Sequence, residues 1–155
     1  METRRERHNI QILTQGGTPS LTDGLTTPKV IVAEDQPALR TLIATGLREA
    51  GYDVVEVQDG AALWEELRAC LKDEDNPREP DLIISDVRMP GYSGLEVLAF
   101  IRKTDWATPV ILITAFGDKE LHNAAYRLGA AQVFDKPFDL KALIATARSL
   151  VGPEN

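Results

Sequence analysis

Short runs of apolar residues alternate five times along the chain with longer stretches in which apolar residues recur every three or four positions. Apolar runs of this length predict buried strands, and the three-to-four spacing predicts amphipathic helices. The predicted strands are residues 30–33, 53–57, 82–86, 110–114 and 133–134. The predicted helices follow them at residues 39–50, 63–71, 95–101, 121–128 and 140–150, and Gly51 and Gly129 end the first and the fourth.

Five consecutive strand–helix units require a parallel sheet with helices on both faces. The first, third and fourth strands are almost wholly apolar, which is typical of central strands buried on both faces. The second strand contains Asp53 and Glu56 and the fifth is short, so both are expected at the edges. The pattern therefore predicts an α/β fold with a doubly wound (βα)5 sheet in the order 2-1-3-4-5, the flavodoxin-like arrangement.

The first 28 residues show neither helical nor strand periodicity and are rich in Thr, Gly, Gln and Pro. We interpret residues 1–28 as a flexible N-terminal tail, in which His8 is a solvated residue. Residues 29–155 then form one domain, long enough to enclose a hydrophobic core.

Charge narrows the classes of partner. The net charge is −7, and the tail contributes nothing to it, because Arg4, Arg5 and Arg7 balance Glu2, Glu6 and Asp23. A domain that binds a nucleic acid backbone needs a basic face, so this chain alone is not expected to bind nucleic acid. An acidic domain suits cations and partners with basic surfaces.

Location can be inferred from apolar runs and cysteine content. No run is long enough to span a bilayer, and the polar, Arg-rich N-terminus does not resemble a signal peptide. The single cysteine, Cys70, falls in the second predicted helix, where we expect it to pack, and cannot form an intramolecular disulfide. These features indicate a cytoplasmic protein without membrane association.

Five polar residues lie where predicted strands end: Glu34 and Asp35 after the first, Asp86 at the end of the third, Thr114 at the end of the fourth and Lys136 after the fifth. Each has an ordinary explanation by itself, such as a turn aspartate, a β-favouring threonine or a solvated lysine. Together they meet at one edge of the sheet. Clustered carboxylates are tolerated when a cation binds or when some of them are protonated, and oxygen ligands suit Mg²⁺, or Mn²⁺ in its place.

Four stretches carry a resemblance to a known family: VIVAEDQPALR, DLIISDVRMPGYSGLEVL, PVILITAFGD and AAQVFDKPFDL. Over residues 29–151 the chain resembles the receiver domain of the response regulators of two-component signal transduction. The resemblance implies that Asp86 is the phosphoacceptor. It also implies that Asp35, Asp86 and the backbone carbonyl of Arg88 bind Mg²⁺ directly, and that Glu34 acts mainly through a metal-bound water.

The same resemblance assigns the two remaining polar residues. Thr114 supplies the hydroxyl that binds the phosphoryl group, and Lys136 is the cation that pairs with this group. The family commonly has a cis peptide bond after this lysine, so the Lys136–Pro137 bond is a candidate for the cis form. The phosphoryl group would come from a sensor histidine kinase or a histidine phosphotransfer protein in a phosphorelay. Such a domain assists its own phosphorylation and dephosphorylation and is not a turnover enzyme.

The sequence departs from the family pattern at two positions. Glu34 stands where the family more often has Asp, which lengthens the reach of the carboxylate by one methylene. Val133 occupies the switch position, where the family usually has Tyr or Phe, and strand alternation turns the adjacent Phe134 to the opposite face. Tyr126 in the fourth predicted helix can act in place of the missing ring or simply pack.

Three functions compete. In the leading one, phosphorylation controls binding to a downstream protein, relay of phosphate to one, or a homodimer formed through the face of the fourth helix, fifth strand and last helix, because no DNA-binding or catalytic region is expected after residue 151. The intact set of Asp86, Thr114 and Lys136 argues against a receiver-like scaffold that works without phosphate, whereas Val133 leaves that alternative open. A Mg²⁺-dependent phosphohydrolase with an Asp nucleophile usually has a second acid two residues after it, where this chain has Arg88.

Overall fold

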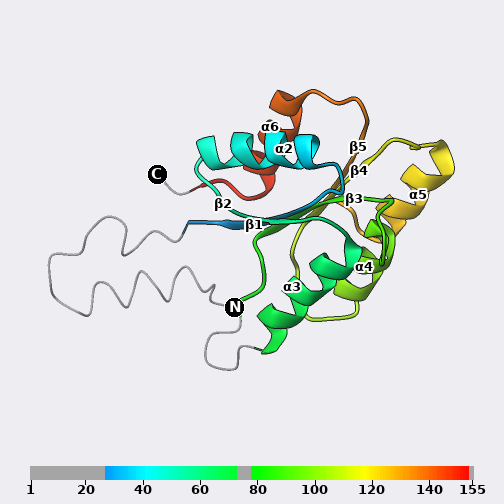
Figure 1. Ribbon diagram of the computed structural model, residues 1–155. Coiled ribbons are helices and arrows are strands. Elements are labelled where there is room, and N and C mark those ends of the chain that lie inside the picture. Colours follow the sequence, from blue (N-terminus) through cyan, green and yellow to red (C-terminus); the bar gives the residue numbers. More distant parts are fainter. Residues whose placement is uncertain (1–26, 73–77, 154–155) are drawn as a thin grey trace, which may run out of the picture.

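The computed structural model of the chain describes residues 27–72 and 78–153. Five parallel strands form one sheet in the order β2-β1-β3-β4-β5 (Figure 1). Their bounds are β1 Lys29–Ala33, β2 Asp53–Val57, β3 Leu82–Asp86, β4 Val110–Thr114 and β5 Gln132–Asp135. The predicted fold class and strand order are confirmed, with the wholly buried β3 and β4 in the interior of the sheet.

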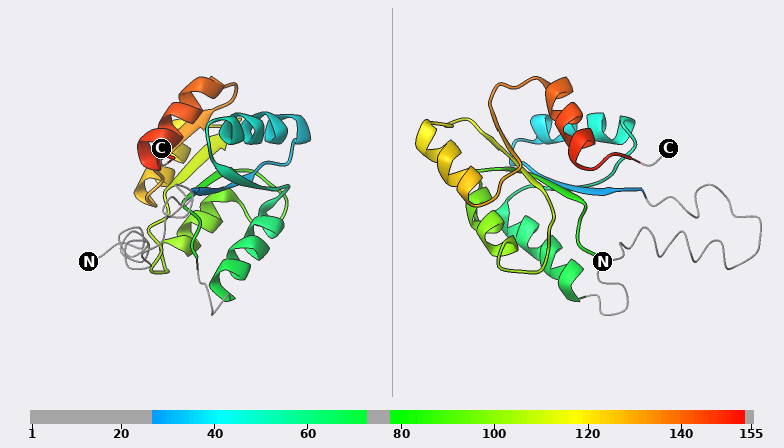
Figure 2. Two further views of the ribbon diagram at one scale, coloured as in Figure 1. Left: turned by 90° about the vertical axis from the view of Figure 1, so that its left-hand side faces the viewer. Right: turned by 180° about the vertical axis from the view of Figure 1, so that it is seen from behind.

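The helices divide between the two faces of the sheet. They are α2 Pro37–Glu49, α3 Gly60–Lys72, α4 Gly94–Ile101, α5 Lys119–Arg127 and α6 Leu140–Leu150. Helices α2 and α6 cover one face, and α3, α4 and α5 cover the other (Figures 1 and 2). This is the two-sided cover that consecutive βα units require.

Strand alternation divides the apolar side chains between two cores. In β1, Val30 and Val32 pack with the residues of α2 and α6, whereas Ile31 and Ala33 pack with those of α3, α4 and α5. Each large apolar side chain buried in this way contributes roughly 1.5–3 kcal/mol. The two cores hold the sheet rigid, and the sheet in turn fixes where each strand ends.

Side-chain caps begin four of the helices, and at the start of α3 the carboxylate of Asp59 accepts the N–H of Ala62 at 2.7 Å. Ser93 and Glu96 form a reciprocal capping box at the start of α4, and Asp118 and Asp139 cap α5 and α6. Caps of this kind contribute about 1 kcal/mol each. Gly51 and Gly129 follow the last residues of α2 and α5 with φ of 102° and 96°, which confirms their predicted role at helix ends.

The structure extends some elements beyond their predicted bounds. Strand β5 includes Gln132 and Asp135, one residue more at each end, because pairing with β4 depends on the backbone and not on apolar side chains. The predicted tail at residues 1–28 lies almost wholly outside the described residues and stays a prediction. Cys70 is buried on α3, as expected.

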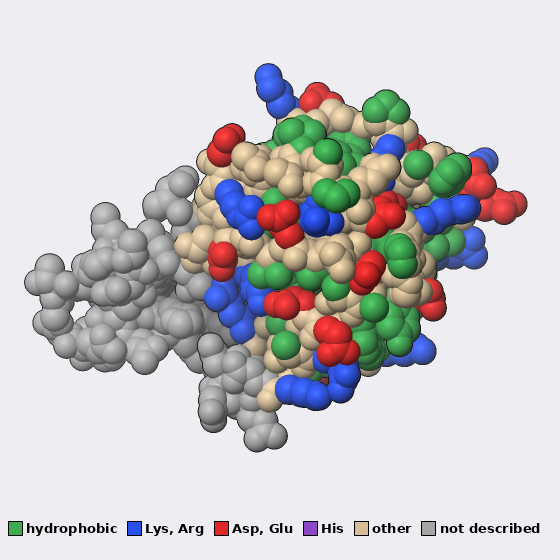
Figure 3. Space-filling model, in the orientation of Figure 1, with side chains coloured by type: hydrophobic (Ala, Val, Ile, Leu, Met, Phe, Trp, Pro, Cys, Tyr) green, Lys and Arg blue, Asp and Glu red, His purple; other side chains and the backbone are tan. Residues whose placement is uncertain are grey.

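The surface of the domain carries charges of both signs. Figure 3 shows basic and acidic side chains interspersed on the face viewed there. Within residues 27–72 and 78–153, no helix has the length and hydropathy needed to cross a membrane.

Candidate functional site

Register brings four strand ends to one edge of the sheet. Ala33 pairs with Ser85, Asp86 with Ile113, and Thr114 with Asp135. Residues that directly follow these pairs therefore lie side by side. In this way the register places the five residues singled out from the sequence at the same edge of the sheet: Glu34, Asp35, Asp86, Thr114 and Lys136.

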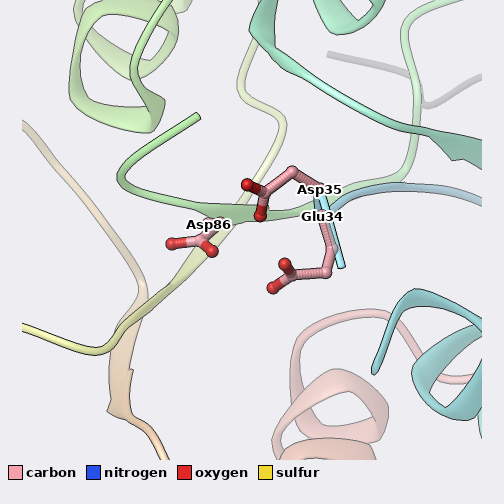
Figure 4. A group of neighbouring side chains, drawn as sticks. All are labelled: Glu34, Asp35 and Asp86. Carbon is pink, nitrogen blue, oxygen red and sulfur yellow. The ribbon is translucent and has the colours of Figure 1, made fainter. Parts of the chain in front are cut away.

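The three acidic residues form a compact cluster. One carboxylate oxygen from each of Glu34, Asp35 and Asp86 lies within 4.8 Å of the others. Figure 4 shows the three carboxylates turned toward a common space at the ends of β1 and β3. Glu34 is completely buried and Asp86 nearly so, whereas Asp35 is exposed and leaves the cluster open to solvent.

The fit of a divalent cation rests on the carboxylate oxygens of Glu34 and its two acidic neighbours. Glu34 Oε2 accepts a hydrogen bond from the backbone N–H of Gln36 at 3.0 Å. Glu34 Oε1 is buried and, within the described part of the chain, has no hydrogen-bond partner. It lies 2.9 Å from Lys136 Nζ but outside hydrogen-bond geometry. A buried carboxylate oxygen in this condition, beside two further carboxylates, matches the oxygen-rich donor set that Mg²⁺ prefers.

The neighbouring carboxylate of Glu34 changes the acidity of Asp35. The pKa of Asp35 is raised above 3.8, chiefly because a protonated Asp35 can hydrogen-bond to Glu34. Partial burial and the negative charge of Glu34 act in the same direction, and Lys136 opposes them. The site thus gains from any cation that neutralises the cluster.

Lys136 supplies one such cation from within the chain. Its Nζ donates a hydrogen bond to Asp86 Oδ2 at 2.7 Å and pairs with Glu34. Burial alone would lower the pKa of the Lys136 ammonium, but its contacts with Asp86 and Glu34 outweigh burial and raise the pKa above 10.5. The Lys136–Pro137 peptide bond is cis, as the resemblance predicted.

Two loops frame the carboxylate of Asp86. The backbone N–H of Arg88 donates to Asp86 Oδ1 at 3.3 Å, and the Arg88 guanidinium lies 4.6 Å from the centre of the Phe116 ring. Thr114 is fully buried, and its hydroxyl oxygen accepts the N–H of Phe116 at 3.1 Å. The β3–α4 and β4–α5 loops therefore meet above the acidic cluster.

The structure also shows how the switch position is built. Val133 packs into the core beneath α3, α4 and α5, and Phe134 packs on the opposite face, as strand alternation predicted. The hydroxyl of Tyr126 accepts the backbone N–H of Val133 at 3.2 Å, which ties α5 to the strand at the switch position. Near the other end of β5, His122 lies 2.9 Å from Asp135.

One contact of the acidic cluster was not predicted from the sequence. Arg40 Nη1 donates to the backbone carbonyl of Glu34 at 2.8 Å. The available signal was its place in the first turns of the helix that directly follows the two acidic residues, a place from which a long side chain can reach back toward the strand.

A family model described as the response regulator receiver domain matches residues 30–148. The chain belongs to the response regulator receiver family. It is 37% identical over 123 residues to the transcriptional regulatory protein FixJ of Azorhizobium caulinodans, which covers 79% of this chain and 54% of that protein. It is 33% identical over 116 residues to the DNA-binding transcriptional regulator NtrC of Escherichia coli, which covers 75% of this chain and 23% of that protein.

Solved receiver structures match nearly over their full length. The receiver domain of the Francisella response regulator 1452 is 29% identical with a TM-score of 0.69, covering 80% of this chain and 96% of that one. The chemotaxis response regulator CheY4 of Vibrio cholerae is 26% identical with a TM-score of 0.69, covering 81% of this chain and 100% of that one. The chain spans about half of the first of these transcriptional regulators and about a quarter of the second.

Proposed function

We propose that this receiver accepts a phosphoryl group from a phosphohistidine onto Asp86 and signals the phosphorylated state through protein–protein contacts. The observation that supports the proposal most is the setting of Asp86. Its carboxylate ends a buried central strand, is held by Lys136 at 2.7 Å and lies in one cluster with Glu34 and Asp35. A nucleophilic carboxylate needs such positioning and nearby cations, because the transferred group carries spread negative charge.

The residues that would hold Mg²⁺ are Asp35, Asp86 and the backbone carbonyl of Arg88, with Glu34 behind them. When bound, the metal neutralises charge on the carboxylates and on the incoming phosphoryl group. Mn²⁺ satisfies the same oxygen ligands.

The side chains of the protein divide the remaining work. Asp86 attacks the phosphorus through a carboxylate oxygen, and the bond from phosphorus to the donor histidine nitrogen breaks as the acyl phosphate forms. Lys136 then pairs with the phosphoryl oxygens, and the Thr114 hydroxyl can donate a hydrogen bond to them. The N–H of Arg88, which already points at Asp86 Oδ1, is a third donor at the same place.

The proposal extends to partners and location. The donor is a sensor histidine kinase or a histidine phosphotransfer protein, which places the chain in the cytoplasm. The output is a downstream protein or a second copy of this chain, bound at the face made by α5, β5 and α6. FixJ and NtrC are named as transcriptional regulators, but the net charge of −7 favours protein contact over direct DNA contact for this domain.

Incubation with Mg²⁺ and acetyl phosphate, followed by intact mass and free phosphate measurement, tests the proposal. A stable adduct of about 80 Da, one phosphoryl group, supports it. Rapid phosphate release without an adduct would instead indicate a phosphohydrolase. No reaction would indicate a scaffold that works without phosphate, the alternative that Val133 leaves open.

A further inference from the structure

Arg40 reaches back from α2 to the end of β1. Its backbone N–H donates one of the first hydrogen bonds of α2, to the carbonyl of Gln36 at 2.9 Å, and this bond fixes the position of the Arg40 Cα. Its side chain then returns along the helix, and Nη1 donates to the carbonyl oxygen of Glu34 at 2.8 Å. The side chain is mostly buried, with 19% of its surface exposed. This is an ordered contact and not a solvated arginine.

The carbonyl that Arg40 holds belongs to the peptide bond between Glu34 and Asp35. A peptide unit is planar, so a hydrogen bond to its oxygen restricts the orientation of the whole unit. The N–H of Glu34 is held by Val57 at 3.1 Å, and the carboxylate of Glu34 is held by the N–H of Gln36. The Arg40 contact therefore completes the restraint of Glu34 and sets the direction in which the chain enters Asp35.

The charge of Arg40 is balanced on the side away from the site. Arg40 Nε lies 3.6 Å from Glu56 Oε1 on β2, and Glu56 Oε2 also accepts a hydrogen bond from Arg48 at 2.9 Å. Glu56 thus anchors the guanidinium and offsets its positive charge. Because the charge of Arg40 is paired with Glu56, the repulsion between Arg40 and a bound cation is weakened. The positional effect of the hydrogen bond from Arg40 to Glu34 should therefore exceed this repulsion.

We propose that Arg40 is a positioning residue for the divalent cation site, acting by fixing the peptide plane that joins Glu34 to Asp35. The inference rests on the proposed Mg²⁺ site of the receiver. It adds a residue that touches neither the cation nor the phosphoryl group. Removal of groups that orient metal ligands typically costs 10–100-fold in metal affinity.

The test is a calorimetric titration of the full chain with Mg²⁺ alone, at a temperature far below the midpoint of unfolding. Arg40→Ala should raise the Kd for Mg²⁺ about tenfold. Arg40→Lys keeps the charge and can keep one hydrogen bond but lacks the planar guanidinium, so its Kd for Mg²⁺ should fall between those of the wild type and Arg40→Ala. Arg48→Ala is the matched control: Arg48 lies on the same helix and binds the same Glu56, yet does not contact Glu34.

The unfolding midpoint in Mg²⁺-free buffer is measured for every variant, so that loss of stability is separated from loss of affinity. An Arg40→Ala protein that melts earlier but binds Mg²⁺ like the wild type would overturn the inference and leave the proposed function intact. Tighter binding in Arg40→Ala would also overturn it, because the charge of Arg40 would then outweigh its positional effect. Failure of the wild type to bind Mg²⁺ would defeat the proposed site itself, and the inference with it.

Discussion

Replacement of Asp35 by Asn is expected to stabilise the protein without Mg²⁺ and to abolish most of the stabilisation that Mg²⁺ provides. The carboxylate oxygens of Glu34, Asp35 and Asp86 lie within 4.8 Å of one another. Two unit charges at about 4.8 Å repel by about 0.9 kcal/mol in bulk water and about 3.5 kcal/mol at an effective dielectric constant near 20. Asp35 is exposed, so the lower figure applies to each of its two like-charge pairs.

Lys136 offsets part of this repulsion, because its ammonium attracts the Asp35 carboxylate. The net gain expected from Asp35→Asn in Mg²⁺-free buffer is therefore about 1 kcal/mol, or roughly 4 °C in the unfolding midpoint. At Mg²⁺ concentrations near 100 times Kd the wild type gains about 2.7 kcal/mol. The variant lacks one of the proposed ligands and should gain little, so the order of stabilities reverses.

The pH dependence provides a second check on the same residue. The pKa of Asp35 is raised in the folded state, so the folded protein holds this proton more tightly than the unfolded chain does. Stability from this group is fully present below the ordinary value of 3.8 and is lost as pH rises through the raised pKa. The advantage of Asp35→Asn over the wild type should thus vanish toward pH 3.8 and be complete near neutrality.

Urea unfolding monitored by circular dichroism, with and without Mg²⁺, measures both effects. Asp105→Asn is the matched control, because Asp105 is an exposed aspartate away from the site and should show neither effect. Asp35→Ala should likewise lose most of the Mg²⁺ response. A full Mg²⁺ response in Asp35→Asn, or a loss of stability in Mg²⁺-free buffer, would refute the reasoning.

Three further outcomes are expected. Lys136→Ala should still take up a phosphoryl group from acetyl phosphate, but its hydrogen exchange in the loop after Thr114 should not change on phosphorylation. In the wild type, the stability that Lys136 supplies should be fully present below pH 10.5 and should be lost as pH rises through the raised pKa of Lys136. Tyr126→Phe removes the hydroxyl that accepts the N–H of Val133 and should cost about 1 kcal/mol in urea unfolding. Beryllofluoride, a phosphoryl mimic, should alter hydrogen exchange at the Arg88 turn and after Thr114 with little effect on α6, because Val133 has no ring to move; strong changes across Tyr126 and α6 would contradict this.

The fold could be predicted because apolar content and strand position are linked by burial. Strands β1, β3 and β4 read as apolar runs because both of their faces are covered, and the polar residues of β2 marked it as an edge. Once the order was known, the carboxyl ends of parallel strands had to meet, and Asp86, Lys136 and the acidic pair had to converge.

The contacts of long side chains could not be predicted in the same way. Arg40 has many rotamers, and only the angle between α2 and β1 makes the Glu34 carbonyl its partner. The contact of Tyr126 with Val133 depends likewise on how α5 lies against the edge of β5. The close approach of the β3–α4 loop to Gly60, where an added Cβ would clash with the Tyr92 carbonyl oxygen, has no signal in the spacing of apolar residues.

The most direct test of the central proposal compares wild type and Asp86→Asn after incubation with Mg²⁺ and acetyl phosphate, by intact mass and by mapping of the labelled peptide. Asn keeps the shape and much of the hydrogen bonding of Asp86 but lacks the nucleophilic carboxylate. The wild type should gain about 80 Da, one phosphoryl group, on the peptide that contains Asp86, and the variant should gain nothing. Equal labelling of both proteins, or a label on another peptide, would contradict the assignment of Asp86 as the phosphoacceptor.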